Sequence, residues 1–498
     1  MSTSAARSAV FVASVSMSVG SAVSQSWTAL AIDEDAVAAG AVPGAFVIRV
    51  AASAAVADGD GQGLVAGLPS VSQSRPVAGG LMMDGAEYHV VRVDDHDDLG
   101  HLEAAIASHS GLSMMPGGAG EETTSDVLVL PNVPFVAEQY AILNRGQVVA
   151  GVAGVSGADV RAAAAWELQR GSAQVRVAVI DSGVSATHPD LVSKLDDGVN
   201  ITGGATDDTD APYNTHGTHI AGIVAASTNN SEGVVGVSWG SRLVPIKAAN
   251  PLGFTSDVWL AEGLLWAADN GVDVAVMSFG LSNYSDVLAD AVRYAHDRGV
   301  IVVASSGNTG ALGVLYPAAY PEVLAVGATD NNDMWAPFST AGPEVEFVAP
   351  GVDIFSTTHT VFDPDTYGFS SGTSVSTPIV AGVAALLRSA DPDVSLEEVR
   401  RILAATARDL GALGRDDLYG FGRVNAQRAL QEILGIQWCY ADVDGSGVIR
   451  PTDFSVWVSM YPTGDPRADQ NRDGVVTPAD FNAFFLNYMG TQGDCFSD

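Results

Sequence analysis

Between residues 175 and 350, short apolar runs alternate with longer segments in which apolar residues recur every three or four positions. Continuous apolar runs are typical of strands buried on both faces, and the longer period is typical of helices packed on a sheet. The runs predict strands at 175–180, 243–247, 272–277, 300–304 and 323–328. The periodic segments predict helices at 216–227, 256–269 and 285–298. This alternation predicts an α/β fold, a parallel sheet with helices on both faces.

A further helix is predicted from about 372 to 389, where almost every residue is small or apolar. It opens with Gly-Thr-Ser, so Ser374 lies in the first turn, where the aligned peptide dipoles favour negative charge. Small residues in the next turns allow other backbone segments to approach closely. These surroundings suit a nucleophilic serine, although serine is also a common helix cap without any catalytic role. A capping box at 395–398 predicts one more helix, from 395 to 409.

Two other segments carry the residue types that a nucleophilic serine requires. Asp181 ends the strand predicted at 175–180 and precedes a glycine turn. His216 lies in Asn-Thr-His-Gly-Thr-His (214–219), at the start of a glycine-rich predicted helix. Open α/β sheets place their sites at the carboxyl ends of strands, which is where Asp181 falls. Taken singly, Asp181 could be a helix cap and His216 an ordinary turn histidine, but their joint occurrence with Ser374 favours catalysis.

The order Asp181, His216, Ser374, each in a glycine-containing motif, resembles that of the subtilisin-like serine proteases. The resemblance covers about 131–430 and implies peptide-bond hydrolysis through an acyl-enzyme, with no cofactor for the chemistry. It also implies that Asn308, in Ser-Ser-Gly-Asn, donates to the oxyanion together with the Ser374 N–H. Asparagine is equally common in tight turns. The context of His216 argues against a sedolisin-type site with a glutamate base.

The same resemblance assigns substrate binding to two segments. Residues 277–280 read Met-Ser-Phe-Gly and match the extended substrate-binding segment of the family. Ser278, Phe279 and Gly280 would pair with the substrate as an added strand. Leu315 matches the floor of the primary specificity pocket, where the family often has glycine or an acid. Leucine would leave the pocket short and apolar, which predicts medium apolar P1 side chains rather than Lys or Arg. Phe279 and Leu315 could equally be core residues.

The resemblance further implies a calcium site beside the histidine helix. Asn230, in the loop 228–234, and Asp190 match the side-chain ligands of the family. Family members often have an aspartate where Val133 stands, and valine cannot supply that carboxylate. The site would therefore be weakened or differently built, and the alternative interpretation of the loop is an ordinary polar turn.

After about residue 436 the chain changes character. Residues 442–453 place oxygen ligands at positions 1, 3, 5 and 12 of a loop with glycine at position 6, and residues 469–480 repeat this pattern. Each loop leads into an aromatic helix, predicted at 454–461 and 481–488. The predicted calcium ligands, position 7 included, are Asp442, Asp444, Ser446, Val448, Asp453, Asp469, Asn471, Asp473, Val475 and Asp480.

The duplicated loop–helix plan resembles dockerin type I modules, small all-α EF-hand-like units. The resemblance implies structural calcium and a cohesin-like partner. A calcium-stiffened surface-attachment module, or two acidic glycine turns without metal, are the alternatives. Cys439 and Cys495 bracket the pair of loops and could form one disulfide in a secreted protein.

The acidic composition restricts the possible partners. The chain has 58 acidic and 23 basic residues, a net charge of −35, which disfavours nucleic acid and anionic lipid. Residues 1–24 carry one arginine, then a serine-interrupted apolar run and small residues, the pattern of a secretory signal; the alternative is a flexible N-terminus. That run is too short for a membrane-spanning helix, and no later stretch predicts one.

Residues 25–130 contain predicted strands at 45–50 and 88–93 and a predicted helix at 99–109. By the resemblance they are an α+β propeptide that assists folding and blocks the active site. The remaining parts are a peptidase domain at 131–435 and the dockerin-like module at 436–498. We expect a monomeric secreted or cell-surface endopeptidase acting on proteins or peptides. A catalytically silent binding or adhesion protein that kept the fold is the rival interpretation.

Overall fold

A computed structural model divides the chain into two units, residues 1–127 and 128–498. In the first unit it describes the backbone of five strands, and in the second it describes residues 130–203, 215–250, 252–359, 366–436, 440–443, 451–470 and 475–491. The predicted helix at 99–109 and both cysteines lie outside the described residues. Outside them, too, lie the loop residues Asp444, Ser446, Val448, Asn471 and Asp473.

The first unit contains an antiparallel five-stranded sheet in the order β1-β2-β3-β5-β4. Its strands are β1 (Val12–Val19), β2 (Val23–Ala31), β3 (Ala45–Val50), β4 (Val71–Pro76) and β5 (Glu87–Val93). The strands predicted at 45–50 and 88–93 are thereby confirmed as β3 and β5. The secretory signal and the propeptide role of this region stay predictions.

The second unit is built on a seven-stranded sheet in which every neighbouring pair is parallel. In spatial order its strands are β14 (Phe347–Pro350), β13 (Val323–Thr329), β12 (Ile301–Ser305), β11 (Val274–Met277), β8 (Arg176–Asp181), β10 (Arg242–Lys247) and β9 (Val199–Asn200). The five strands predicted from apolar runs are confirmed to within two residues. The two edge strands, β14 and β9, were not predicted, because runs of four and two residues are too short to show a pattern.

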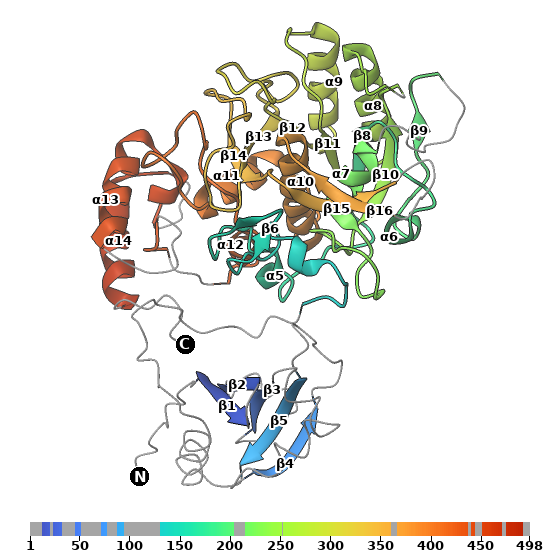
Figure 1. Ribbon diagram of the computed structural model, residues 1–498. Coiled ribbons are helices and arrows are strands. Elements are labelled where there is room, and N and C mark those ends of the chain that lie inside the picture. The colour runs from blue at the N-terminus through green and yellow to red at the C-terminus, as the bar shows by residue number, and fades with distance from the viewer. Residues whose placement is uncertain are drawn as a thin grey trace. The chain divides into compact units, whose positions relative to one another are not determined.

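Helices cover both faces of this sheet, as Figure 1 shows. Side chains of alternate strand residues enter two separate cores: Val177 and Val179 one, Ala178 and Ile180 the other. The first core is shared with α7 (His216–Ala225), α10 (Thr373–Ala390), α11 (Leu396–Thr406) and α12 (Ala426–Ile433). The second is shared with α8 (Asp257–Asp269) and α9 (Asp286–His296). The predicted α/β fold with a doubly covered parallel sheet is confirmed.

Helix α10 is the helix that positions Ser374, and it is the central element of the first core. Among the described residues it is also the one helix long and apolar enough, by length and composition, to cross a membrane. Its residues from Val375 to Leu387 are fully buried, and it packs against β11, β12, β13 and β14. Burial against the sheet therefore accounts for its apolar composition.

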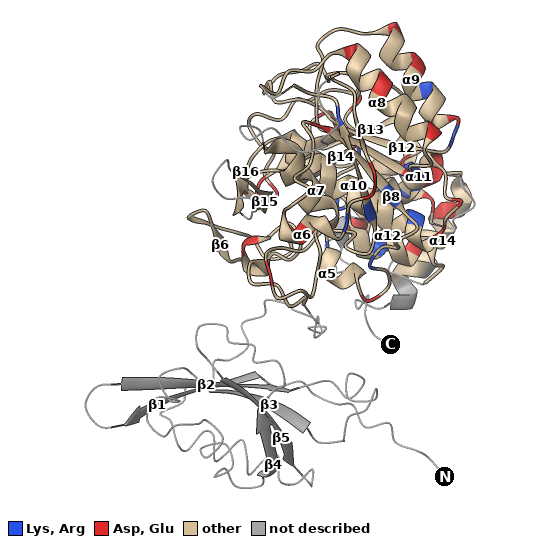
Figure 2. Cartoon of the chain, turned by 90° about the vertical axis from the view of Figure 1, so that its right-hand side faces the viewer, with Lys and Arg blue, Asp and Glu red and all other residues tan. Residues whose placement is uncertain are grey.

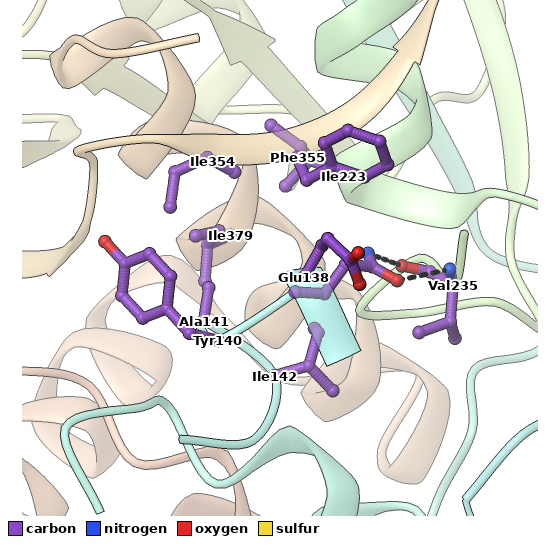
Figure 3. Close-up of a pocket in the computed structure, with 10 residues that line it drawn as sticks. Glu138, Tyr140, Ala141, Ile142, Ile223, Val235, Ile354, Phe355 and Ile379 are labelled. Atoms are coloured by element: carbon purple, nitrogen blue, oxygen red, sulfur yellow. Dashed lines mark hydrogen bonds between the residues drawn. The ribbon is translucent and has the colours of Figure 1, made fainter. Parts of the chain in front are cut away.

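The chain enters this unit through residues 131–143, which pack against α7 and α10. Gln139 bridges to Val235 in both directions: its Nε2 donates to the Val235 carbonyl at 2.8 Å, and its Oε1 accepts from the Val235 N–H at 2.9 Å. Both residues line a small apolar pocket with Ile223 of α7 and Ile379 of α10. Figure 3 shows Val235, Ile223 and Ile379 around this pocket. The entry segment thus contacts both helices that carry the predicted nucleophile and base.

The C-terminal module, residues 440–491, belongs to the same compact unit. Its described elements are α13 (Pro451–Met460), η2 (Tyr461–Thr463), η3 (Pro466–Ala468) and α14 (Pro478–Thr491). The aromatic helices predicted at 454–461 and 481–488 are confirmed as α13 and α14. The module has a small core of its own, formed by Ala441, Val443, Val456, Trp457, Met460, Ala468 and Phe484.

Candidate active site

Asp181 and His216 meet at the carboxyl end of β8. One oxygen of Asp181, Oδ1, lies 2.8 Å from Nδ1 of His216, the first residue of α7. The Asp181 side chain is 1% exposed and that of His216 is 30% exposed, so the carboxylate is buried behind a ring that solvent reaches. The Ser182 N–H also donates to Asp181 Oδ1, at 2.7 Å. With Nδ1 directed at Asp181, Nε2 lies on the opposite edge of the ring.

The close approach of α7 to this turn depends on a glycine. A Cβ at Gly217 would stand 2.1 Å from the Gly183 carbonyl oxygen and 3.1 Å from Asp181 Cβ. No side chain fits there without moving backbone. The Gly that follows His216 in the sequence is therefore what allows His216 to reach Asp181.

The motif His-Gly-Thr-His contains a second histidine, His219, which the structure excludes as the base. His219 is fully buried, and its Nε2 lies 3.2 Å from the Gly368 carbonyl oxygen. Burial lowers the pKa of His219 to about 4, so the ring is neutral at neutral pH. Its place is structural, between α7 and β16 (Thr366–Ser370).

Ser374 is the second residue of α10 and is partly exposed. Pro378 stands four residues on and has no N–H to donate, so the Ser374 carbonyl lacks the usual intrahelical donor. Ser278 Oγ supplies a donor instead, at 2.8 Å. Ser278, predicted to bind substrate, therefore also anchors the backbone of the predicted nucleophile.

Asn308 lies beside the first turn of the same helix. Its Oδ1 accepts from the Thr373 N–H at 2.8 Å and from Thr373 Oγ1 at 3.0 Å. These two donors identify the accepting atom as oxygen, so the Asn308 amide N–H₂ points the other way. A Cβ built at Gly372 would lie 3.0 Å from Ser374 Oγ and 3.3 Å from Asn308 Nδ2, so hydroxyl and amide border the same point.

The sequence analysis did not predict a role for Thr373, although Thr373 is the residue that orients Asn308. Its hydroxyl accepts from the Gly307 N–H at 3.2 Å and donates to Asn308 Oδ1. In the sequence, the one sign of this role was that Thr373 precedes Ser374. Its hydrogen-bond partners, Gly307 and Asn308, are far away in the sequence. Thr373 is thus a positioning residue for the predicted oxyanion donor.

The segment 278–279 links the two sides of the site. Ser278 donates to the Ser374 carbonyl, and the ring of Phe279 lies 6.0 Å from the ring of His216. No hydrogen bond joins Ser374 Oγ to His216 in the described part of the chain. Hydrogen bonds between catalytic groups are often long before substrate binds, so the geometry remains compatible with a nucleophile–base pair.

Leu315 lies between two glycines that the sequence places far apart. A Cβ at Gly280 would stand 2.5 Å from Leu315 Cδ1, and one at Gly307 would stand 2.8 Å from the same atom. The Leu315 N–H donates to the Ser306 carbonyl at 3.0 Å. Segments 278–281, 305–308 and 314–316 therefore surround one small space, and the leucine side chain occupies part of it.

Asp190 and Asn230, the predicted side-chain ligands of a calcium site, lie in contact with each other. Asn230 Nδ2 donates to Asp190 Oδ1 at 2.7 Å, and the Val234 N–H donates to Asp190 Oδ2 at 2.9 Å. Both carboxylate oxygens are thus engaged by protein donors, and the amide turns its nitrogen to the acid. The described residues contain no group of three or more His, Cys, Asp or Glu side chains that could hold a metal. The two residues therefore lie in contact, and their role as calcium ligands stays a prediction.

The described residues of the two C-terminal loops make protein contacts as well. Asp442 forms an ion pair with Arg428 of α12. Asp480 accepts from the Gln470 N–H at 2.9 Å through Oδ1 and from the Thr477 N–H at 2.7 Å through Oδ2. Asp453 is fully buried. Val475 directly follows the loop residues 471–474 that the structure does not describe, and Asp469 lies two positions before them. These contacts do not test calcium binding, so the two calcium loops stay a prediction.

Comparison with known proteins agrees with this geometry. A model of the subtilase family matches residues 172–422. M-protease of Shouchella clausii is 39% identical over 351 residues, which cover 68% of this chain and 87% of that protein. Subtilisin Savinase of Lederbergia lenta is 45% identical over 259 residues, covering 51% of this chain and 90% of that one.

A solved protease structure from Pseudoalteromonas arctica superposes with a TM-score of 0.55 at 29% identity, covering 61% of this chain and 99% of that one. The residues matched by the family model, 172–422, include Asp181, His216 and Ser374. The chain belongs to the subtilase family and is a hydrolase of the subtilisin-like serine protease class.

Proposed function

We propose that the chain is a secreted serine endopeptidase that uses Asp181, His216 and Ser374 as its catalytic triad. The observation that carries this proposal is the 2.8 Å contact between Oδ1 of the buried Asp181 and Nδ1 of His216, whose ring is partly exposed to solvent. Ser374 and Asn308 border a common point at the adjacent helix start, which is where a peptide carbonyl would be attacked.

In the proposed mechanism Ser374 Oγ attacks the peptide carbonyl while His216 Nε2 takes its proton and later delivers it to the leaving amine. Asp181 holds Nδ1 protonated and stabilises the imidazolium. The Asn308 amide and the Ser374 N–H donate to the oxyanion of the tetrahedral intermediate. Water then attacks the acyl-enzyme by the same proton transfers in reverse, so neither metal nor cofactor is needed for the chemistry.

A serine-directed fluorophosphonate tests this assignment directly. The wild-type chain, freed of its N-terminal region, is expected to be labelled at Ser374, and peptide mapping of the adduct checks the position. A folded wild-type chain that neither reacts nor hydrolyses casein would favour the rival proposal, a catalytically silent binding protein.

The substrate is proposed to lie along Ser278, Phe279 and Gly280 as an added strand, with its P1 side chain next to Leu315. We predict that wild type prefers medium apolar P1 residues, because the Leu315 side chain fills space between Gly280 and Gly307. Leu315→Ala should raise the kcat/KM ratio of P1 Phe over P1 Val about tenfold, since methylene-sized changes in apolar pockets have effects of that order. Cleavage of a peptide library by each variant measures the ratio.

The exposed Leu312, three residues away, provides the matched control. Leu312→Ala removes the same atoms outside the surrounded space and should leave the P1 profile unchanged. A wild-type profile dominated by P1 Lys or Arg, or a Leu315→Ala profile equal to wild type, would refute the assignment of Leu315 to the specificity pocket.

The C-terminal module is proposed to bind calcium through residues 442–453 and 469–480 and to attach the enzyme to a cohesin-like or cell-surface partner. The helical elements α13 and α14, which follow the two loops, support this proposal. A further calcium site is proposed in the peptidase domain at Asp190 and Asn230, whose side chains lie in contact with each other.

Chelation provides the test of the module. In a Ser374→Ala chain, which cannot cut itself, removal of calcium should speed amide exchange in 451–470 and 475–491, because a metal that binds only the folded state stabilises it. At a hundred times the Kd this linkage is worth about 2.7 kcal/mol. Restoring calcium should reverse the effect, and magnesium at equal concentration should not. Equal exchange rates with and without calcium would reject the calcium proposal.

A further inference from the structure

The contact between the C-terminal module and the peptidase part of the unit is built from buried charges. Arg467 of η3 is 2% exposed, and its guanidinium contacts two carboxylates. Its Nη1 lies 3.0 Å from Asp409 Oδ1, on the peptidase side. Its Nε and Nη2 lie 2.9 and 2.7 Å from the two oxygens of Asp465, on its own module. Figure 2 shows acidic and basic residues gathered around α11, α12 and α14.

A second ion pair joins the same two parts, with the positions of arginine and aspartate exchanged. Here the peptidase part contributes the arginine, Arg428 of α12, and the module contributes the acid, Asp442. The side chains are 10% and 0% exposed. Each side therefore buries an arginine and an aspartate that find their charge partners on the other side. Burying a charge is costly unless it is paired, so separation of the two parts would have to expose all four groups to water.

Arg467 also holds a segment that covers the open edge of the central sheet. Its Nη1 donates to the Phe421 carbonyl at 2.9 Å. Residues 421–424 run along the edge strand β14: the Phe421 N–H donates to the Glu346 carbonyl at 2.7 Å, and the Val348 N–H to the Gly422 carbonyl at 3.0 Å. An uncovered edge strand offers unpaired backbone groups to other chains, and covering it is a common protection.

We propose that the C-terminal module is a fixed part of the peptidase unit, docked through Arg467–Asp409 and Arg428–Asp442, and that it holds residues 419–424 against edge strand β14. This role differs from that of a module joined only by a linker. It does not rest on the proposed catalytic residues or on calcium. The surface that receives the module is formed by α11, α12 and the loop 409–421, and its partner is the chain's own module.

Hydrogen exchange of the full chain tests the proposal. In the Ser374→Ala background, Arg467→Met should leave Asp409 and Asp465 buried without their cation. Exchange of the amides at 419–424 and 346–348 should then rise at least about tenfold, and Tm should fall by roughly 5 °C. Arg293→Met is the matched control, because Arg293 pairs with Asp290 on the surface, with side chains 56% and 71% exposed. It should change neither quantity.

Asp409→Asn is the milder variant and decides the matter if Arg467→Met does not fold. It keeps the shape of the side chain and leaves Arg467 with Asp465, so exchange at 419–424 and 346–348 should rise in the same direction by a smaller factor. Faster exchange confined to 440–491, with 346–348 and 419–424 at the background rate, would overturn the proposal and identify a module joined by its linker alone. Because amide exchange and Tm are compared between variants in one background, without any measurement of turnover, neither outcome depends on the catalytic assignment.

Discussion

Ser374→Ala is expected to abolish peptide-bond hydrolysis, with kcat lowered about 10⁶-fold. That size is the one known for the corresponding residue of subtilisin, a relative of this chain, and is carried over. The physical reason is that alanine lacks the hydroxyl oxygen proposed as the nucleophile, which lies beside the Asn308 amide. Hydrolysis of a chromogenic peptide, at substrate concentrations spanning KM, measures the loss.

The variant should remain folded, which makes the result interpretable. In the described part of the chain, the Ser374 hydroxyl makes no hydrogen bond that the substitution would remove. The hydrogen bond that Ser278 Oγ donates to the Ser374 carbonyl does not involve the changed atom. Ser376→Ala, two residues further along the helix, is the matched control, because the Ser376 hydroxyl donates to the Thr373 carbonyl of the same helix at 3.0 Å. Turnover within tenfold of wild type in Ser374→Ala would disprove the nucleophile assignment, as would comparable loss in Ser376→Ala.

The sequence predicted those parts of the fold that local pattern determines. Strands β8, β10, β11, β12 and β13 are continuous apolar runs buried on both faces, and their carboxyl ends coincide with the motifs around Asp181 and Asn308. Strand β14 escaped prediction because its four residues end in Pro350. It exists because β13 on one side and residues 421–424 on the other supply its hydrogen bonds, and such partners are not visible in a local window.

Roles that depend on distant partners escaped prediction for the same reason. Thr373 orients Asn308 across a separation of 65 positions. Ser278 was predicted to bind substrate, but the sequence did not indicate that its hydroxyl donates to the Ser374 carbonyl, 96 positions away. Arg467 is one basic residue among 23 in the chain, with no motif around it. Only the folded structure reveals that it is buried between Asp409 and Asp465.

Asp442 illustrates how a motif residue can serve two environments. The loop pattern predicted it as a calcium ligand, and the structure pairs it with Arg428. A carboxylate can accept at both oxygens, so the ion pair and a metal contact are chemically compatible. The calcium loops and the docked module are therefore separate proposals that share one residue.

Asp181→Asn is expected to lower kcat about 10⁴-fold while KM changes little. The magnitude is the one known for the triad aspartate in serine proteases and is carried over. Asparagine keeps the shape, and the Ser182 N–H, which donates to Oδ1 at 2.7 Å, favours an oxygen in that position. What the substitution removes is the carboxylate oxygen 2.8 Å from His216 Nδ1, which in the proposed mechanism stabilises the imidazolium formed during proton transfer.

Labelling with a fluorophosphonate separates this variant from Ser374→Ala. Asp181→Asn retains the nucleophile, so it should still be labelled, but far more slowly than wild type, whereas Ser374→Ala should not be labelled at all. Asp290→Asn is the matched control, because Asp290 is 71% exposed and far from any role in the site, and it should react at the wild-type rate. If Asp181→Asn were labelled and turned over within tenfold of wild type, the charge on Asp181 would not contribute to catalysis. The buried contact with His216 would then be a structural hydrogen bond only.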